Sequence, residues 1–151
     1  MRPALTDTFQ DEAQIHSILD DAAKALYAKD ADAMVAHYAD DIVVANLAPP
    51  LRNKASEGRN KGVLEQWFDT WSGPINLELR DVHIEISGNL AFAYGVSRMS
   101  GTKRNGERPD IWTRVTHCFR KERGEWKIAH LHDSVPFYMD GSYRAATDLK
   151  P

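Results

Sequence analysis

The chain has 151 residues, which is the length of one domain and enough to bury roughly two thirds of its unfolded surface. Lysine and arginine number 19 against 22 aspartates and glutamates, so the formal net charge is −3 and no global positive field exists to hold nucleic acid or an anionic membrane. The longest unbroken apolar run, residues 90–94, is far below the ~18 residues of a membrane-spanning helix. One cysteine, Cys118, permits no internal disulfide. These features predict a single cytoplasmic domain without a membrane or nucleic-acid partner.

The first half of the chain has helical periodicity. Apolar residues within 11–28 recur every three or four positions, which places one apolar stripe on a helix. A short second helix is expected around 31–38 and a third over 63–71. Between them, β-branched residues predict a strand at 42–46, and the prolines at 49–50 end it.

From residue 75 the apolar pattern alternates with a period of two. Odd positions are apolar up to Leu79 and even positions from Val82, so one residue near Arg80 and Asp81 must be absorbed by a β-bulge that bends the strand. Three further strands are expected, over 90–99, 110–121 and 125–136. Helices followed by a meander predict an α+β fold, in which three N-terminal helices pack on a curved antiparallel or mixed sheet and form a cone with an internal cavity. The domain is expected to span 1–151, with 138–151 as a C-terminal tail.

Several expected strands are apolar on both faces. On the strand 90–99, for example, Phe92 and Tyr94 oppose Ala91 and Ala93. Because the helices can cover only one face of the sheet, the other face would expose a larger apolar patch than monomers usually carry. We therefore expect a second copy of the chain to bury it, which gives a homodimer.

The order of the elements, with the segment 39–44 between the second and third helices, resembles the nuclear transport factor 2-like superfamily. The last two strands, 112–121 and 124–137, are similar to its SnoaL-like branch; the second carries the pattern G-x-W-x-I-x-H-x-H-x-S. That branch includes polyketide cyclases, relatives of ketosteroid isomerase and the association domain of calcium/calmodulin-dependent kinase. The pattern is typical of the branch and indicates no particular reaction.

Ketosteroid isomerase uses a carboxylate base together with a protonated acid and a tyrosine that hold the dienolate oxygen. The resemblance places Asn46 at the position of the base, Ala22 at that of the tyrosine, and Thr116 or His117 at that of the second acid. An amide accepts no proton at neutral pH, which argues against steroid isomerisation. Asn46 could still orient a carbonyl or a water in a substrate site.

The best candidates for proton transfer are His130 and His132. They share parity with Trp126 and Ile128, which predicts that both imidazoles point into the cone unless a bulge intervenes. There they would act as general base or acid, contact a ligand, or simply be hydrogen-bonded core histidines. If the strand slips by one residue, Asp133 enters the interior instead and both histidines leave it. All three residues are therefore candidate catalytic groups.

A second polar line follows the neighbouring strand, where Trp112, Arg114 and Thr116 alternate. A buried arginine must be paired or must await an anion, so Arg114 either holds a ligand carboxylate or enolate or pairs internally, with Asp133, Glu85 or a partner subunit. The aromatic residues expected to line the pocket are Trp67, Phe68 and Tyr94. Aromatic stripes at helical spacing are also common in plain cores.

The sequence contains no phosphate loop, dinucleotide fingerprint, nucleophile elbow or paired cysteines, so no cofactor is expected. The spacing of His130 and His132 suits two metal ligands, but no third ligand follows, and no metal site is expected. The interpretation is a pocket for a small hydrophobic or acidic ligand, with cofactor-free isomerisation, cyclisation, dehydration or hydrolysis by histidine acid–base chemistry. The alternative is a non-catalytic ligand-binding or oligomerisation domain similar to the kinase association domain.

Overall fold

The computed structural model describes residues 5–151, with side chains from residue 7 onward. Its helices are α1 (Leu5–Ala28), α2 (Ala31–Val35), α3 (Ala55–Gly58) and α4 (Lys61–Phe68). Its strands are β1 (Tyr38–Ala45), β2 (Asn76–Ser87), β3 (Leu90–Ser100), β4 (Asp110–Glu122) and β5 (Glu125–Ser134). Within these residues, no helix has the length and apolar character needed to cross a membrane.

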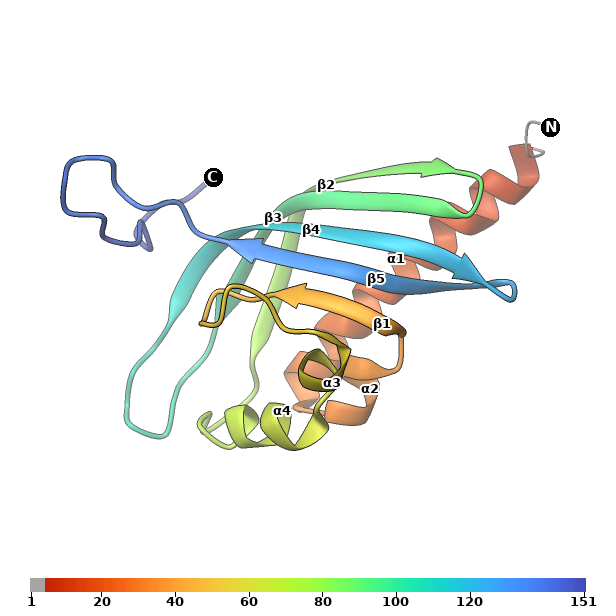
Figure 1. Cartoon of the computed structure of the whole chain (residues 1–151). Helices are drawn as coiled ribbons and strands as arrows, with labels where there is room; N and C mark the ends of the chain where they lie inside the picture. The colour runs from red at the N-terminus through yellow and green to blue at the C-terminus, as the bar shows by residue number, and fades with distance from the viewer. Residues whose placement is uncertain (1–4) are drawn as a thin grey trace.

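The strands form one open mixed sheet in the order β1-β5-β4-β3-β2 (Figure 1). β1 runs parallel to β5, and every other neighbouring pair is antiparallel. α1 crosses one face of the sheet, and the α+β expectation is confirmed. That concave face holds the main core, in which α1 contributes Ile15, Ile18 and Leu19 and the sheet contributes residues such as Ala93 and Phe119.

The expected second helix is shorter than its pattern predicted. It ends at Val35, and β1 begins at Tyr38, where residues up to 38 were expected to be helical. Pairing with β5 decides this boundary, because Tyr38 already lies opposite Ile128 in the parallel ladder. Tertiary pairing therefore overrides local helical preference at this junction. A short helix, α3, also forms after the prolines that follow β1, where no helix was expected.

The bulge expected in β2 is present. The register between β2 and β3 shifts between Arg80 and His83, and Asp81 has a φ of 57°. On the neighbouring strand Gly95 allows close approach, because a Cβ there would lie 2.7 Å from the Arg80 carbonyl oxygen. The glycine and the bulge together bend the sheet over α1.

A second bulge, in β5, determines where the candidate residues point. Phe119 lies opposite Ile128, but the next residue of β4 toward its start, Cys118, lies opposite His130. Ala129 is therefore the extra residue of β5. Because of this extra residue, the residues after Ala129 point to the faces opposite to those that a regular alternation from Trp126 and Ile128 would give them.

Candidate functional site

The β5 bulge turns His130 and His132 onto the outer, convex face of the sheet. His132 lies opposite Thr116, and Thr116 lies opposite Tyr94, whose side chain is 47% exposed. Directly opposed residues share a face, so the expectation that the histidines point inward is wrong. His130 is held by a 2.8 Å hydrogen bond between its Nδ1 and the Val43 carbonyl oxygen. The two imidazole centroids are 6.2 Å apart.

The polar line of β4 lies on the same outer face. Trp112, Arg114 and Thr116 alternate with buried residues, so they do not line the cone as expected. Arg114 Nε donates to Ser134 Oγ at 3.1 Å, and among residues 7–151 no carboxylate pairs with its guanidinium. The expected internal partners, Asp133 and Glu85, are therefore not used. Tyr94 also lies on this face, and its ring stacks with Phe92 at 6.1 Å between centroids.

The remaining expected lining residues are divided between core and surface. Phe68 is buried in a second core cluster with Trp71 and Ile75, and Trp67 packs against that cluster. The rings of Trp67 and Phe68 are 5.6 Å apart. Asn46 follows the last residue of β1 and is exposed. These three residues do not converge on the histidines.

The concave face carries a different set of polar groups. Asp133 lies opposite Val115, and His117 lies opposite both Ala93 and Leu131. Val115 is 6% exposed and His117 8% exposed, so both positions face the core beneath α1. Of the two arrangements considered for the last strand, the observed one therefore has Asp133 inside and both histidines outside.

Burial shifts the pKa values of these interior groups toward their neutral forms. Desolvation raises the pKa of Asp133 from 3.8 to about 6 and lowers that of His117 from 6.5 to about 4. The pKa of Tyr38 rises to about 12, mainly through burial and additionally through the charge of Asp133. Within residues 7–151 no hydrogen bond or ion pair holds the Asp133 carboxyl. The partly buried Asp133 carboxyl therefore shares the concave face with the neutral imidazole of His117, and its charge also acts on the neutral phenol of Tyr38.

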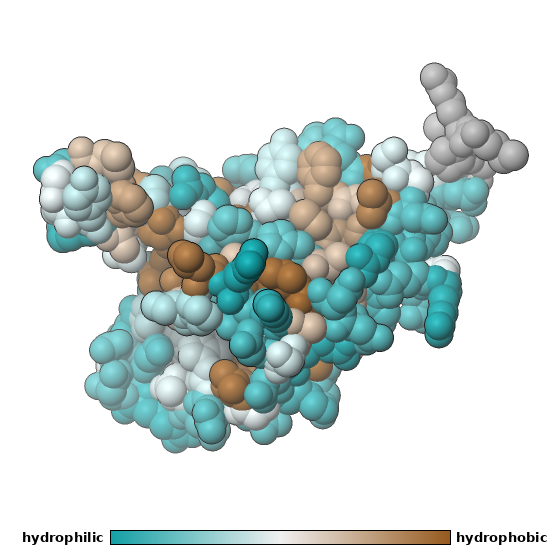
Figure 2. All heavy atoms as spheres, viewed as in Figure 1, coloured by the Kyte–Doolittle hydropathy of each residue, from teal (hydrophilic) through white to brown (hydrophobic). Residues whose placement is uncertain are grey.

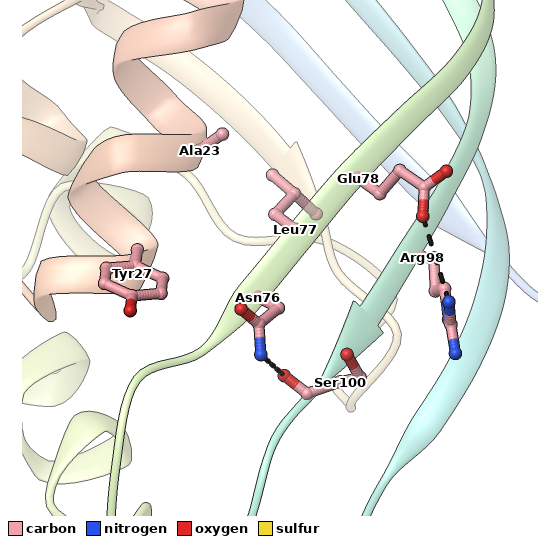
Figure 3. A pocket seen from close by; sticks show the side chains of 7 residues that line it. All are labelled: Ala23, Tyr27, Asn76, Leu77, Glu78, Arg98 and Ser100. Atoms are coloured by element: carbon pink, nitrogen blue, oxygen red, sulfur yellow. Dashed lines mark hydrogen bonds and ion pairs between the residues drawn. The ribbon is translucent and has the colours of Figure 1, made fainter.

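Two spaces lie along β2: an inner one between α1 and the sheet, which His117 helps to line, and an outer one at the edge of the sheet, which no residue of this polar group lines. The inner one, lined by residues such as Leu19, Leu79 and His117, holds about 10 Å³, which is room for about one water. The outer one is a cleft of about 390 Å³ beside β2 (Figure 3). Its walls are Ala23, Tyr27, Asn76, Leu77, Glu78, Arg98 and Ser100. Interior side chains thus nearly fill the space in which a cavity was expected.

The sequence contained a signal for part of this interior group. Four successive odd positions of β4 are buried, at Thr113, Val115, His117 and Phe119, and this parity could have placed His117 inside. Only the resemblance drew attention to His117, as one possible position of the second acid. Tyr38 carried no signal, because its segment was interpreted as helix.

Within residues 7–151, no group of three or more histidines, cysteines or carboxylates is arranged to hold a metal ion. His130 and His132 remain a pair without a third ligand at hand. Because both histidines lie on the outer face, Asp133 and His117 on the concave face cannot complete a metal site with them.

The sequence profile of the SnoaL-like domain matches residues 15–138. A search of curated proteins gives no match. Among solved structures, the chain is similar to a nuclear transport factor 2-like protein of unknown function from Pseudomonas putida, at 27% identity, 95% and 98% coverage of the two chains, and a TM-score of 0.82.

Two more distant structures share the fold alone. A hexachlorocyclohexane dehydrochlorinase from Novosphingobium barchaimii is 16% identical, with 86% and 89% coverage and a TM-score of 0.74. A ketosteroid isomerase-like protein from Erwinia carotovora is 22% identical, with 81% and 93% coverage and a TM-score of 0.67. With a profile match over most of its length and this architecture, the chain belongs to the SnoaL-like domain family.

Proposed function

We propose that the concave face binds a small, largely apolar molecule with a carbonyl group, and that Asp133 moves a proton on it without a cofactor. The reaction class is isomerisation, aldol-type cyclisation, dehydration or hydrolysis. The observation that carries this proposal is the Asp133 carboxyl, which is partly buried on the concave face, has no hydrogen-bond or ion-pair partner among residues 7–151, and has its pKa raised to about 6 by desolvation. Carboxyls with this combination of burial and shift are frequent at catalytic sites.

The neighbours of Asp133 suit the chemistry of an enolate. At neutral pH Asp133 is ionised and can accept a proton from the carbon beside a carbonyl, and a pKa near 6 matches a base to that pH. His117 occupies the next cross-strand pair on the same face and is a diagonal neighbour of Asp133, roughly 7–8 Å away. Neutral His117 and Tyr38 can each donate a hydrogen bond to the oxygen that becomes negative. The proton-transfer role expected for His130 and His132 therefore passes to Asp133.

Deuterium exchange tests this proposal without knowledge of the natural substrate. Purified protein is incubated in D₂O with a panel of apolar cyclic ketones, and loss of the α-proton signal is followed by NMR. We expect the wild type to accelerate exchange for part of the panel and Asp133→Asn to lose about 10²-fold or more of that acceleration. Asp40→Asn, an exposed carboxylate paired with Arg59, is the matched control. Equal exchange by wild type and Asp133→Asn would refute the role of Asp133.

The second candidate function, an oligomerisation domain, is favoured by the outer face of the sheet. Leu90, Phe92 and Tyr94 are 62%, 42% and 47% exposed there, and no other described element covers them. Figure 2 shows hydrophobic residues grouped on this side of the sheet and bordered by hydrophilic ones. We propose that a second copy covers this face, so that His130 and His132 lie at a dimer interface. We also propose a cytoplasmic location. It is supported by the single thiol of Cys118, because reducing compartments keep thiols unpaired.

A further inference from the structure

His130 and His132 form half of a metal-ligand set on the outer face of the sheet. We propose that two copies of the chain, packed through their outer faces, hold one Zn²⁺ ion between them, with His130 and His132 of each copy as its four ligands. The inference rests on the second candidate function, in which a second copy covers this face, and it identifies what that contact binds. Three observations carry it: the arrangement of the two imidazoles, the lack of a third ligand within one copy, and the central position of the pair on the face.

The fold prepares His130 as a metal ligand. Its Nδ1 lies 2.8 Å from the Val43 carbonyl oxygen, and because a carbonyl oxygen only accepts hydrogen bonds, Nδ1 carries the proton. In the neutral ring the other nitrogen, Nε2, then keeps its lone pair. Metal-binding histidines typically donate their second ring N–H to a carbonyl or carboxylate in this way. The hydrogen bond therefore fixes both the tautomer and the ring orientation that a metal ion needs.

His132 is placed to bind the same ion. It is exposed, and among residues 7–151 neither of its ring nitrogens has a hydrogen-bond partner. Its ring centroid lies 6.2 Å from that of His130, with the two ring planes at 68°. Two imidazoles on one tetrahedral Zn²⁺ have centroids roughly 5 Å apart, because each Zn–N bond is ~2 Å long. A small rotation of the exposed His132 side chain closes this difference.

One copy of the chain cannot complete the site. A structural zinc site takes four ligands in a tetrahedron, and imidazole nitrogen is one of the ligands that Zn²⁺ prefers. Within residues 7–151, no third histidine, cysteine or carboxylate joins His130 and His132 in a metal-binding group. A twofold contact brings the same residues of both copies together, so two identical pairs supply the four nitrogens. The proposed site therefore exists only in the dimer.

The pair lies near the middle of the outer face. β4 is the third of the five strands, and Thr116 is its middle residue (Figure 1). His132 lies directly opposite Thr116 on β5, so their Cβ atoms are roughly 5 Å apart. The twofold axis of a contact between two copies of one face passes through the middle of that contact, so central residues meet their own counterparts. Stacked sheets lie ~10 Å apart, a gap that two imidazole side chains and one ion can span.

Zinc-dependent dimerisation tests the inference. Untagged protein is stripped of metal with EDTA and titrated with Zn²⁺ in a calorimeter, and its dimer dissociation constant is measured by sedimentation equilibrium with and without Zn²⁺. We expect one Zn²⁺ per two chains, and a dimer dissociation constant that falls about 100-fold at 100 times the zinc dissociation constant. His132→Gln should weaken zinc binding at least about 100-fold. His16→Gln, which changes an exposed histidine of α1, is the matched control and should bind zinc as the wild type does.

Cobalt replaces zinc to report the ligand set. We expect the intense visible absorption of tetrahedral Co²⁺ in the wild type and its loss in His130→Gln. A weak octahedral spectrum, or a thiolate charge-transfer band from Cys118, would overturn the four-imidazole set. Melting temperatures in EDTA show whether the variants fold, and His132→Gln, at an exposed position, decides the test if His130→Gln unfolds.

The remaining outcomes separate the metal site from the dimer. A dimer that binds no Zn²⁺ and is unchanged by it keeps the oligomerisation proposal and overturns the metal site. One Zn²⁺ per chain, or equal zinc affinity in His132→Gln and His16→Gln, overturns the shared histidine site. A monomer both with and without Zn²⁺ overturns the metal site and the dimer together.

Discussion

Asp133, which is partly buried, and His117, which is buried, are titratable groups whose pKa values shift in opposite directions. For Asp133 the folded pKa of about 6 exceeds the ordinary 3.8, so its stabilising contribution is complete below pH 3.8 and is lost as pH rises toward 6. For His117 the folded pKa of about 4 is below the ordinary 6.5, so its contribution is complete above pH 6.5 and is lost as pH falls toward 4. Each shift corresponds to as much as about 3 kcal/mol. The two effects largely cancel between pH 4 and 6.

Single substitutions should separate the contributions of Asp133 and His117 to the pH dependence of the free energy of unfolding. The free energy of unfolding is measured with urea between pH 4 and 7. In Asp133→Asn only the contribution of His117 remains, so we expect this free energy to rise with pH more steeply than in the wild type. In His117→Gln only the contribution of Asp133 remains, so the free energy of unfolding should fall as pH rises. In the double variant both contributions are absent, so its pH dependence should again resemble that of the wild type. Parallel curves for all four proteins would show that neither group is buried as described.

At the scale of elements, the N-terminal half of α1 is anchored by one buried carboxylate. Asp11, 7% exposed, accepts hydrogen bonds of 2.9 Å from Lys121 Nζ and Trp126 Nε1. We expect Asp11→Ala to lower the free energy of unfolding by about 2 kcal/mol, because the indole N–H is left buried without an acceptor. Glu12→Ala, which removes an exposed pair with His16, should change it by less than about 0.5 kcal/mol. Similar losses in the two variants, measured by urea unfolding, would contradict the anchoring role.

The bend between β2 and β3 depends on the missing side chain of Gly95. A methyl group there would meet the backbone of the β2 bulge at 2.7 Å, so we expect Gly95→Ala to destabilise the fold by about 2 kcal/mol. At Gly73 an added Cβ meets nothing within 4 Å, and its φ is not positive, which makes Gly73→Ala the control. Chemical denaturation of the two variants checks this. Equal stabilities would mean that the bulge yields without cost.

The two bulges show what sequence reasoning can and cannot find. The β2 bulge was predicted because apolar residues change parity across Asp81, from Leu79 to Val82. The β5 bulge follows Ile128 and precedes a mixture of polar and apolar residues that fits either register, so nothing local marks Ala129. Its position is set by pairing with β4 and β1. The facing of His130, His132 and Asp133 therefore followed from tertiary structure and not from their spacing.

For the molecule as a whole, the fold class followed from the order of helical and alternating patterns, whereas the volume of the interior did not. Volume depends on how side chains from α1 and the sheet interdigitate, which periodicity does not encode. The two-faced apolar strands, in contrast, indicated the exposed outer face correctly at Phe92 and Tyr94.

That outer face gives a prediction about assembly. We expect the wild type to sediment as a dimer at micromolar concentration and Phe92→Glu to raise the dimer dissociation constant about 100-fold or more, because it buries a charge at the interface centre. Val63→Glu alters an apolar residue of α4 that is 59% exposed, away from this face, and should leave the dimer intact. A monomeric wild type in analytical ultracentrifugation, or equal effects of both variants, would contradict this assembly.

The most direct measurement is the titration of the Asp133 carboxyl carbon by ¹³C NMR, with Asp133→Asn used to assign the resonance. A midpoint near pH 6 is expected if the carboxyl lies unpaired on the concave face beside His117. A midpoint near 3.8, the value of a solvated aspartate, would place the carboxyl in water and remove the proposed base from the interior.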